Sequence, residues 1–449
     1  MAIAVSSERR ADAPPGDVAT LAGGARVLTL SAGPQAMTLM VFVGAGSRYE
    51  TRETAGTAHL LEHLSFSGTE TRPSLAAVAA ELDSIGCRFN AFTEKEYTGY
   101  FVRGAADYAV PALAVLADVF ARPALADGDL ERERRVVLGE MRMHEDNPRS
   151  LVRLLANRAL YGDTPLGWDT AGFRDVVSRV TRDDLLAFRR ELYVAERVTF
   201  VFAGPFDHER CVALAAEQLD GMEPGGAAPP AAVAYAPPVN LAVRRDTAQA
   251  NLILTLSGPS YRCSEREMLV ARLVNSILGG SMSSRLFVSV RERQGLCYSI
   301  RSFLEPLSDA GGLFVFANTA PEAVGRTVGS ILDEVERLVG EGVDEAEVTK
   351  AKAMTKGIYA LEREESSSLA RLSAFELLQR GVISSAAEKF ELIDSIGAED
   401  VDAAARRYLR TDGLRVALVG PERAESALRE SRLLPSEDWL DAAELLPSR

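Results

Sequence analysis

The sequence predicts an α+β protein of two homologous domains, each a mostly antiparallel sheet with helices packed on one face. Three observations support this prediction. The chain has 449 residues, too many for one ordinary domain. A stretch rich in proline and glycine at 223–239 divides it nearly in half. The two halves also carry similar patterns at their starts and ends. We therefore expect domains at 15–222 and 240–435, joined by a linker at 223–239.

The expected elements follow the same order in each half. Each half starts with a strand, a turn and a second strand, at 26–47 and 241–260. Long segments with apolar residues at helical spacing follow, such as 74–86 and 107–121. Each half ends with a helix, a short turn, a buried strand and Gly-Pro, at 189–205 and 406–421. These parallels indicate a duplication, and a chance likeness between common strand and helix patterns is the alternative.

Composition narrows the class of protein. Hydrophobic residues make up 47% of the chain and charged residues 25%, as in globular proteins. A net charge of −14 argues against nucleic acid as a partner, because a phosphate backbone attracts basic surfaces. That charge is either ordinary solvated surface or an acidic cavity suited to basic peptides.

Cysteine spacing and hydropathy bear on location. Cys87, Cys211, Cys263 and Cys297 stand far apart and form no CxxC motif, which is typical of free thiols in a reducing compartment. The first sixteen residues lack the apolar core of a secretion signal, and no run of about twenty apolar residues could span a membrane. We therefore expect a soluble cytoplasmic protein without a membrane partner.

The segment GTAHLLEHLSFSGT, at 56–69, contains an H-x-x-E-H motif formed by His59, Glu62 and His63. Residues four apart share one face of a helix, so the two imidazoles would point toward one ion. A zinc site for hydrolysis needs such ligands, an open coordination position and a carboxylate that takes a proton from water. Two histidines that merely occur together on an amphipathic helix are the alternative, and a third ligand would distinguish the two.

The segment 127–146 is a strong helix candidate that could supply this ligand. Glu133 and Glu140 are seven residues apart and so lie on one side of that helix. His144, four residues beyond Glu140, could also approach a metal, and a surface histidine is the alternative.

The chain resembles the pitrilysin and mitochondrial-processing-peptidase family of zinc metallopeptidases, whose signature is H-x-x-E-H. In that family 76 residues separate the second histidine from a glutamate ligand, and here 76 residues (140 − 63 − 1) separate His63 from Glu140. Glu133 matches a second family glutamate seven residues earlier. The resemblance implies one zinc ion per chain, bound by His59, His63 and Glu140. It implies that Glu62 is the general base and that Glu133 orients a ligand, with a solvated carboxylate as the alternative for Glu133.

Two further segments resemble substrate-binding parts of the family. In 86–101, Asn90 and Ala91 match a strand that pairs with the substrate backbone, and an ordinary edge strand is the alternative. In 278–299, Arg291 and Tyr298 match a pair that reaches the substrate and could stabilise an oxyanion. The second half has no H-x-x-E-H motif of its own.

The resemblance extends from about residue 18 to about residue 430. Full-length members form a clamshell from four such domains, so this chain would be half of one. The resemblance therefore implies a homodimer, or a heterodimer with a related subunit, in which the second domain of one subunit faces the zinc domain of the other. We predict a zinc metalloendopeptidase that hydrolyses short or unfolded peptides, in general degradation or in processing of a precursor's leader. A catalytically silent structural or binding subunit is the alternative, although such members lack one or more metal ligands.

Overall fold

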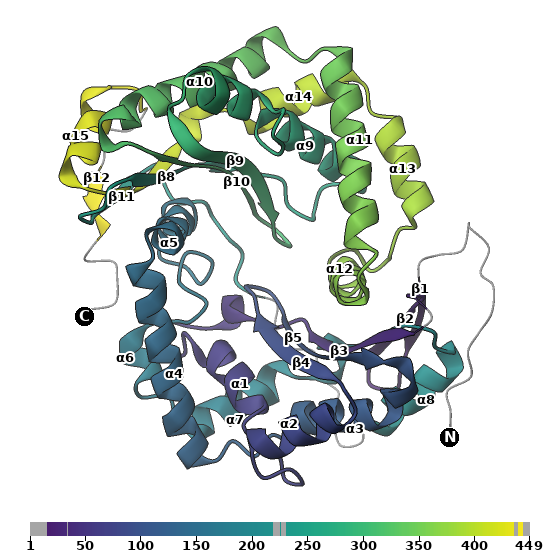
Figure 1. Cartoon of the computed structure of the whole chain (residues 1–449). Coiled ribbons are helices and arrows are strands. Elements are labelled where there is room, and N and C mark those ends of the chain that lie inside the picture. The colour runs from purple at the N-terminus through teal and green to yellow at the C-terminus, as the bar shows by residue number, and fades with distance from the viewer. Residues whose placement is uncertain (1–15, 34, 219–224, 226–229, 435–438, 443–449) are drawn as a thin grey trace. The chain divides into compact units, whose positions relative to one another are not determined.

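The computed structural model describes residues 16–33, 35–218, 225, 230–434 and 439–442 (Figure 1). The chain forms two compact units, each built around a six-stranded sheet. Each unit is discontinuous: the first contains 1–141, 169–231 and 359–388, and the second contains the rest. The predicted domain ends at 15 and 435 and much of the linker lie outside the described residues, and those boundaries stay a prediction.

The sheet of the first unit has the strand order β1-β2-β6-β3-β5-β4. Strands β2 and β6 run parallel, and the other neighbours run antiparallel. Strand β4 forms one edge of the sheet, a position that matters for the site described below. The strands are β1 (Gly16–Thr20), β2 (Arg26–Leu30), β3 (Ala36–Val43), β4 (Arg88–Thr93), β5 (Thr98–Ala105) and β6 (Val198–Ala203).

The sheet of the second unit has the order β12-β7-β11-β8-β10-β9. Strand β7 is parallel to both β12 and β11, and the remaining neighbours are antiparallel. The strands are β7 (Asn240–Arg244), β8 (Ala250–Ser257), β9 (Cys297–Pro306), β10 (Gly311–Thr319), β11 (Arg415–Gly420) and β12 (Trp439–Asp441).

Five strands of one sheet correspond to five strands of the other in order and direction. The series β2-β6-β3-β5-β4 matches β7-β11-β8-β10-β9, with one parallel pair followed by three antiparallel pairs in each. The prediction of two domains with one mostly antiparallel topology is therefore confirmed.

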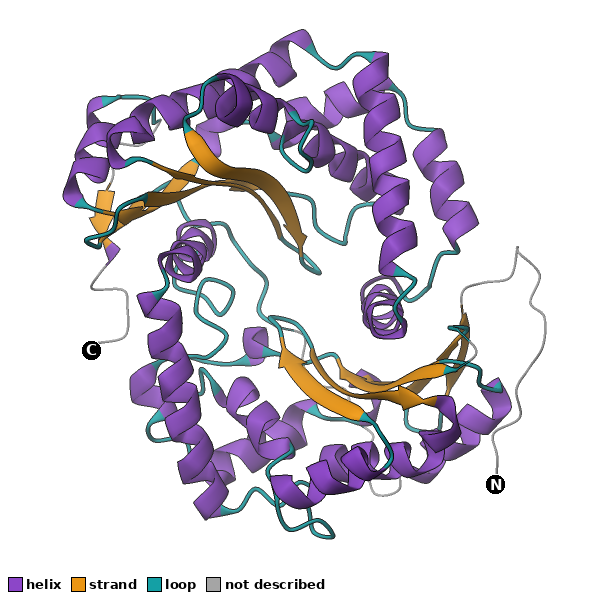
Figure 2. Cartoon of the chain, in the orientation of Figure 1, coloured by secondary structure: helices purple, strands orange, loops and turns teal. Residues whose placement is uncertain are grey.

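Most helices pack on one face of each sheet (Figure 2). Alternate strand residues such as Leu39, Val41 and Phe200 face the helices of the first unit, as expected from the period of two in a strand. The helices of this layer are α1 (Thr57–Ser65), α2 (Leu75–Ser84), α3 (Ala109–Ala121), α4 (Asp127–Asp146), α6 (Arg174–Val177), α7 (Arg182–Leu192) and α8 (His208–Gln218). In the second unit they are α9 (Glu265–Leu278), α10 (Val324–Glu341), α11 (Glu345–Glu362), α13 (Ala386–Asp394), α14 (Ala398–Tyr408) and α15 (Glu422–Glu430).

The opposite face of each sheet is covered by one helix that comes from the other half of the chain. Helix α12 (Ser366–Arg380) buries Leu369, Ala374 and Leu377 against β2, β3 and β6 of the first sheet. Helix α5 (Pro148–Tyr161) packs against β7, β8 and β11 of the second sheet. The two halves therefore exchange helices, which the sequence prediction of helices on one face did not include.

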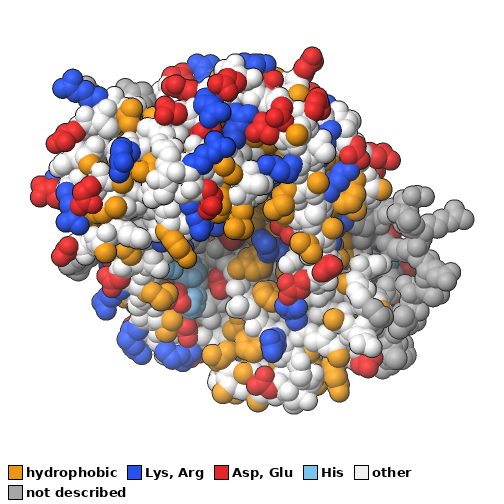
Figure 3. Space-filling model, turned by 45° about the horizontal axis from the view of Figure 1, so that its top comes forward, with side chains coloured by type: hydrophobic (Ala, Val, Ile, Leu, Met, Phe, Trp, Pro, Cys, Tyr) orange, Lys and Arg blue, Asp and Glu red, His pale blue; other side chains and the backbone are white. Residues whose placement is uncertain are grey.

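None of the helices in the described part of the chain combines the length and apolar character needed to cross a bilayer. On the visible face, acidic and basic side chains are interspersed (Figure 3).

Candidate metal centre

Helix α1 carries the H-x-x-E-H motif and is firmly seated in the first unit. Its leucines Leu60, Leu61 and Leu64 are fully buried. The side chains of His59 and His63 lie on the other side and are 18% and 17% exposed. One face of the helix therefore anchors it, and the other presents the imidazoles.

Glu140, on helix α4, meets the two histidines. Its Oε2 lies 3.5 Å from His63 Nε2 and 3.9 Å from His59 Nε2. One ligand atom from each of the three residues lies within 4.8 Å of the others. Tetrahedral zinc bonds of about 2.0–2.1 Å separate neighbouring ligand atoms by about 3.3 Å. Two imidazoles and one carboxylate at this spacing fit a catalytic zinc site, and no other group of three or more such ligands occurs among the described residues.

Glu133 lies against the outer side of His63. Its Oε2 is 3.3 Å from His63 Nδ1, and its side chain is 12% exposed. Ser67 Oγ donates a hydrogen bond of 3.4 Å to the other carboxylate oxygen. A proton held on Nδ1 by Glu133 leaves the Nε2 lone pair of His63 for a metal. Glu133 therefore has the position of a ligand-orienting residue, and Ser67, which the sequence analysis missed, supports it.

Glu62 is absent from the ligand group and points to the neighbouring sheet edge. Thr93 Oγ1, on β4, donates a hydrogen bond of 2.7 Å to Glu62 Oε2. Burial raises the pKa of the Glu62 carboxyl; the hydrogen bond from Thr93 and the charge of His63 oppose this, and the charges of Glu140 and Glu94 reinforce it. A carboxylate with a raised pKa is better suited to accept a proton near neutral pH. Thr93 was not among the residues expected from the sequence, although it lies only two residues beyond Ala91 on the same strand.

Asn90 and Ala91 lie on β4, the edge strand beside helix α1. Glu94 N donates to Tyr97 O at 2.8 Å, so Glu94 and Tyr97 form a hydrogen-bonded pair at the end of the β4–β5 hairpin. Because hydrogen-bonded and non-hydrogen-bonded pairs alternate, the backbone groups of Phe89, Ala91 and Thr93 point to the open edge. Asn90 Oδ1 accepts a hydrogen bond of 2.9 Å from the outward N–H of Ala91.

Arg291 and Tyr298 lie together in the second unit. Arg291 belongs to a π-helical turn (η4, Phe287–Arg293), and its Cζ is 5.3 Å from the centre of the Tyr298 ring. Tyr298, on edge strand β9, is 73% exposed. The structure thus brings this pair together in one unit and the metal ligands together in the other. Their joint action on a substrate stays a prediction.

His144 and His208 take no part in the ligand group. His144 is exposed near the end of α4. His208 Nδ1 lies 2.9 Å from Thr29 Oγ1.

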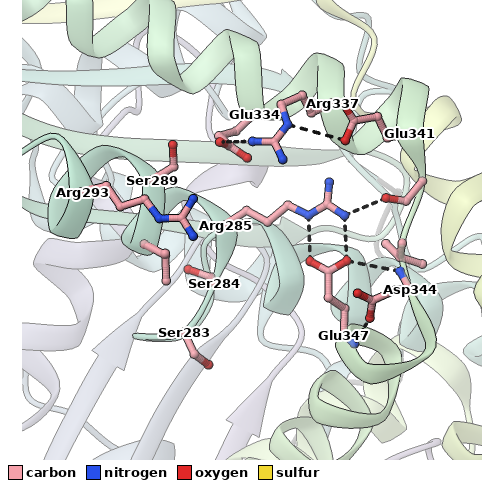
Figure 4. A pocket seen from close by; sticks show the side chains of 13 residues that line it. Ser283, Ser284, Arg285, Ser289, Arg293, Glu334, Arg337, Glu341, Asp344 and Glu347 are labelled. Carbon is pink, nitrogen blue, oxygen red and sulfur yellow. Dashed lines mark hydrogen bonds and ion pairs between the residues drawn. The ribbon is translucent and has the colours of Figure 1, made fainter.

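A pocket of about 470 Å³ lies in the second unit (Figure 4). Its polar groups are largely paired with each other. Arg285 forms two hydrogen bonds with Glu347, and Arg337 pairs with Glu334 and Glu341. Paired charges of this kind stabilise the wall of a pocket. The candidate site for chemistry is therefore the ligand group of His59, His63 and Glu140 in the first unit.

The fold and this ligand group match what is expected of proteins with the H-x-x-E-H motif. Residues 26–172 match the family profile described as "Insulinase (Peptidase family M16)", and residues 179–355 match "Peptidase M16 inactive domain". The chain therefore belongs to the insulinase, or pitrilysin, family of peptidases.

Relatives agree with this membership, and a solved structure agrees with the fold. An "Uncharacterized zinc protease" of Mycobacterium tuberculosis is 35% identical over 417 residues, which covers 91% of this chain and 94% of the relative. The "Uncharacterized zinc protease YmxG" of Bacillus subtilis is 31% identical over 381 residues, covering 85% and 92%. The crystal structure of "a protease from Helicobacter pylori" is similar in fold, with a TM-score of 0.83 and 20% identity, over 91% of this chain and 100% of that one.

Proposed function

We propose that this chain is a zinc metalloendopeptidase that hydrolyses short or unfolded peptides. One observation carries the proposal: two histidines of α1 and a glutamate of α4 place their ligand atoms within 4.8 Å of one another. Glu62, on the same helix as the histidines, is held by Thr93 instead and so remains available as a base. Membership of a peptidase family, and relatives named zinc proteases, support the same conclusion.

Each residue of the site has a separate role in the proposed reaction. His59, His63 and Glu140 would hold the ion, and Glu133 would keep His63 in the tautomer that binds it. When bound, zinc would supply Lewis-acid chemistry that polarises the peptide carbonyl and lowers the pKa of water. Glu62 would accept a proton from the attacking water and pass it to the leaving amine. Thr93 engages one Glu62 oxygen and leaves the other for the water.

The open edge of β4 supports binding of an extended peptide. A peptide strand that adds to a sheet edge gains main-chain hydrogen bonds without a demand on its side chains. The outward groups of Phe89 and Thr93 and the carbonyl of Ala91 provide such an edge next to the base, whereas the N–H of Ala91 donates to Asn90 Oδ1. This arrangement suits unfolded peptides, whether they come from general degradation or from a precursor's leader.

Glu62→Gln tests the assignment directly. The variant should keep its zinc, because Glu62 is no ligand, and lose at least about 100-fold in kcat for an unstructured peptide, because the base is gone. Elemental analysis and peptide hydrolysis on the same preparation measure both. His63→Ala is the contrasting variant and should lose the ion itself.

Two outcomes would contradict the proposal. Wild-type hydrolysis by Glu62→Gln would refute the role of the base. A wild-type protein that binds zinc but cleaves no peptide would favour the alternative, a catalytically silent binding subunit.

We further propose that the active form is a homodimer in which Arg291 and Tyr298 of one subunit act on substrate bound at the zinc of the other. The exposure of Tyr298 and its contact with Arg291 support this role. Pairing with a related subunit is the alternative. A cytoplasmic location is also part of the proposal, because the four cysteines are free thiols, as expected in a reducing compartment.

A further inference from the structure

Helix α1 starts without the usual side-chain cap. Its N-cap residue, Gly56, has φ of 101° and no capping side chain. A Cβ there would lie 2.5 Å from Ala171 O and 2.7 Å from Val177 Cγ2. Serine, threonine, aspartate and asparagine are the preferred N-caps, and each would bring that Cβ. The first N–H groups of the helix therefore need an acceptor from elsewhere.

Glu50 supplies that acceptor from outside the helix. Its Oε2 accepts a hydrogen bond of 2.9 Å from Gly56 N, and its Oε1 accepts one of 2.7 Å from Ala58 N. The residue is 5% exposed. Burial raises the pKa of Glu50 to about 8, and the N–H groups of Ala58 and Gly56 oppose this. Near neutral pH both the neutral and the ionised carboxyl are accessible, and each keeps an acceptor oxygen for the helix.

The segment that carries Glu50 is hydrogen-bonded to the β4–β5 hairpin, whose Thr93 binds Glu62. In the turn η1 (Ser47–Tyr49), Ser47 N donates to Glu94 O at 3.1 Å and Arg48 N donates to Lys95 O at 2.7 Å. The buried side chains of Arg48 and Glu96 also form an ion pair of 2.5 Å. Glu94 follows Thr93 directly, so Glu50 joins the metal-binding helix to the strand that orients Glu62.

We propose that Glu50 is a positioning residue for the metal centre: by holding the first turn of α1, it fixes the direction in which His59 presents its imidazole. The inference rests on the proposed zinc site. His59 follows Ala58, whose N–H Glu50 holds, and α1 has only nine residues, so the first turn is a large part of the helix. Buried groups that orient metal ligands typically contribute 10- to 100-fold to metal affinity.

The test compares Glu50→Ala and Glu50→Gln with a matched loss of a helix cap elsewhere. Ser74 caps α2, a helix without metal ligands, by accepting from Ala77 N at 3.2 Å. Ser74→Ala should therefore lower the melting temperature and leave zinc binding unchanged. The zinc dissociation constant, from competition with a chelator, and the visible absorption spectrum of the cobalt-loaded protein report the geometry of the site independently of activity.

Glu50→Ala should weaken zinc binding about 10- to 100-fold and change the cobalt spectrum. Glu50→Gln keeps one acceptor oxygen and should lie between Glu50→Ala and the wild type. Wild-type zinc affinity and cobalt spectrum in Glu50→Ala would overturn the inference. If Glu50→Ala does not fold, the zinc affinity and cobalt spectrum of Glu50→Gln test the inference, and wild-type values for both would overturn it. A wild-type protein without zinc affinity would overturn the proposed function and this inference with it, whereas unchanged variants beside a zinc-binding wild type overturn the inference alone.

Discussion

Asp118, on helix α3, is a buried carboxylate with a full set of donors. It is fully buried and accepts hydrogen bonds from Thr69, from Thr71 at 2.6 Å, from Arg72 at 2.7 Å and from Arg122 at 2.8 Å. Burial acts to raise the pKa of Asp118, but these donors outweigh it and lower the pKa to about 2. The group ties the segment after α1 to the helix layer beneath the sheet.

This depressed pKa makes a prediction about acid stability. The stabilisation by Asp118 is fully present above its unfolded-state pKa of about 3.9 and is lost as the pH falls toward 2. It amounts to roughly 2–3 kcal/mol. Asp118→Asn should therefore lose less stability than the wild type between pH 4 and pH 2, measured as the free energy of unfolding in urea. Asp83→Asn, at an exposed position on α2, is the control. Equal acid losses in wild type and Asp118→Asn would contradict the prediction.

The four-residue spacing predicted that His59 and His63 share a helix face, and the resemblance to the zinc peptidases supplied Glu140; the structure brings the three together. Thr93, Ser67 and Glu50 escaped the sequence analysis for a physical reason. Thr93 and Ser67 each act through one hydrogen bond to a residue 31 or 66 positions away, and Glu50 acts through two hydrogen bonds to the start of α1, six and eight positions further on. Such contacts leave no periodic pattern in the sequence. Threonine, serine and glutamate are mostly exposed residues, so their presence in a sequence does not indicate a contact of this kind.

At the scale of elements, the edge strand β4 makes a prediction about substrate backbone chemistry. If a peptide adds to this edge, its N–H groups should alternate between bonded and free. N-methylation at every second peptide position should raise KM about 2- to 10-fold per lost bond, whereas N-methylation at the intervening positions should have a much smaller effect. Steady-state kinetics on the two peptide series measures this. Identical KM values in both series would show that the strand does not pair with substrate.

The helices expected at 74–86, 107–121 and 127–146 followed from apolar periodicity, and the duplication followed from the matching ends of the two halves. The sheets against which α5 and α12 pack could not be predicted from the sequence. An apolar stripe such as Leu369, Ala374 and Leu377 shows that a helix is buried, but it does not indicate which sheet buries it. That choice depends on how each apolar helix face fits the side chains of the two sheets.

At the scale of the whole molecule, the proposed dimer predicts complementation. Glu62→Gln and Tyr298→Phe should each be nearly inactive. In a mixed dimer one of the two sites would combine an intact base with an intact tyrosine. Random exchange at equal amounts should therefore restore about a quarter of wild-type activity. Hydrolysis by the mixture, with subunit exchange verified from differently tagged chains, measures this. Exchange without recovered activity would exclude action across the subunits.

The reciprocal placement of α5 and α12 means that neither half of this polypeptide is self-sufficient. A fragment ending at residue 222 would leave Leu28, Met40 and Phe42 without their covering helix, and its own α5 would lack the surface that it normally covers. Such a fragment should aggregate when it is expressed alone. Although the two sheets have the same topology, each needs a helix from the other half of the chain. Separating the halves should therefore destabilise both sheets.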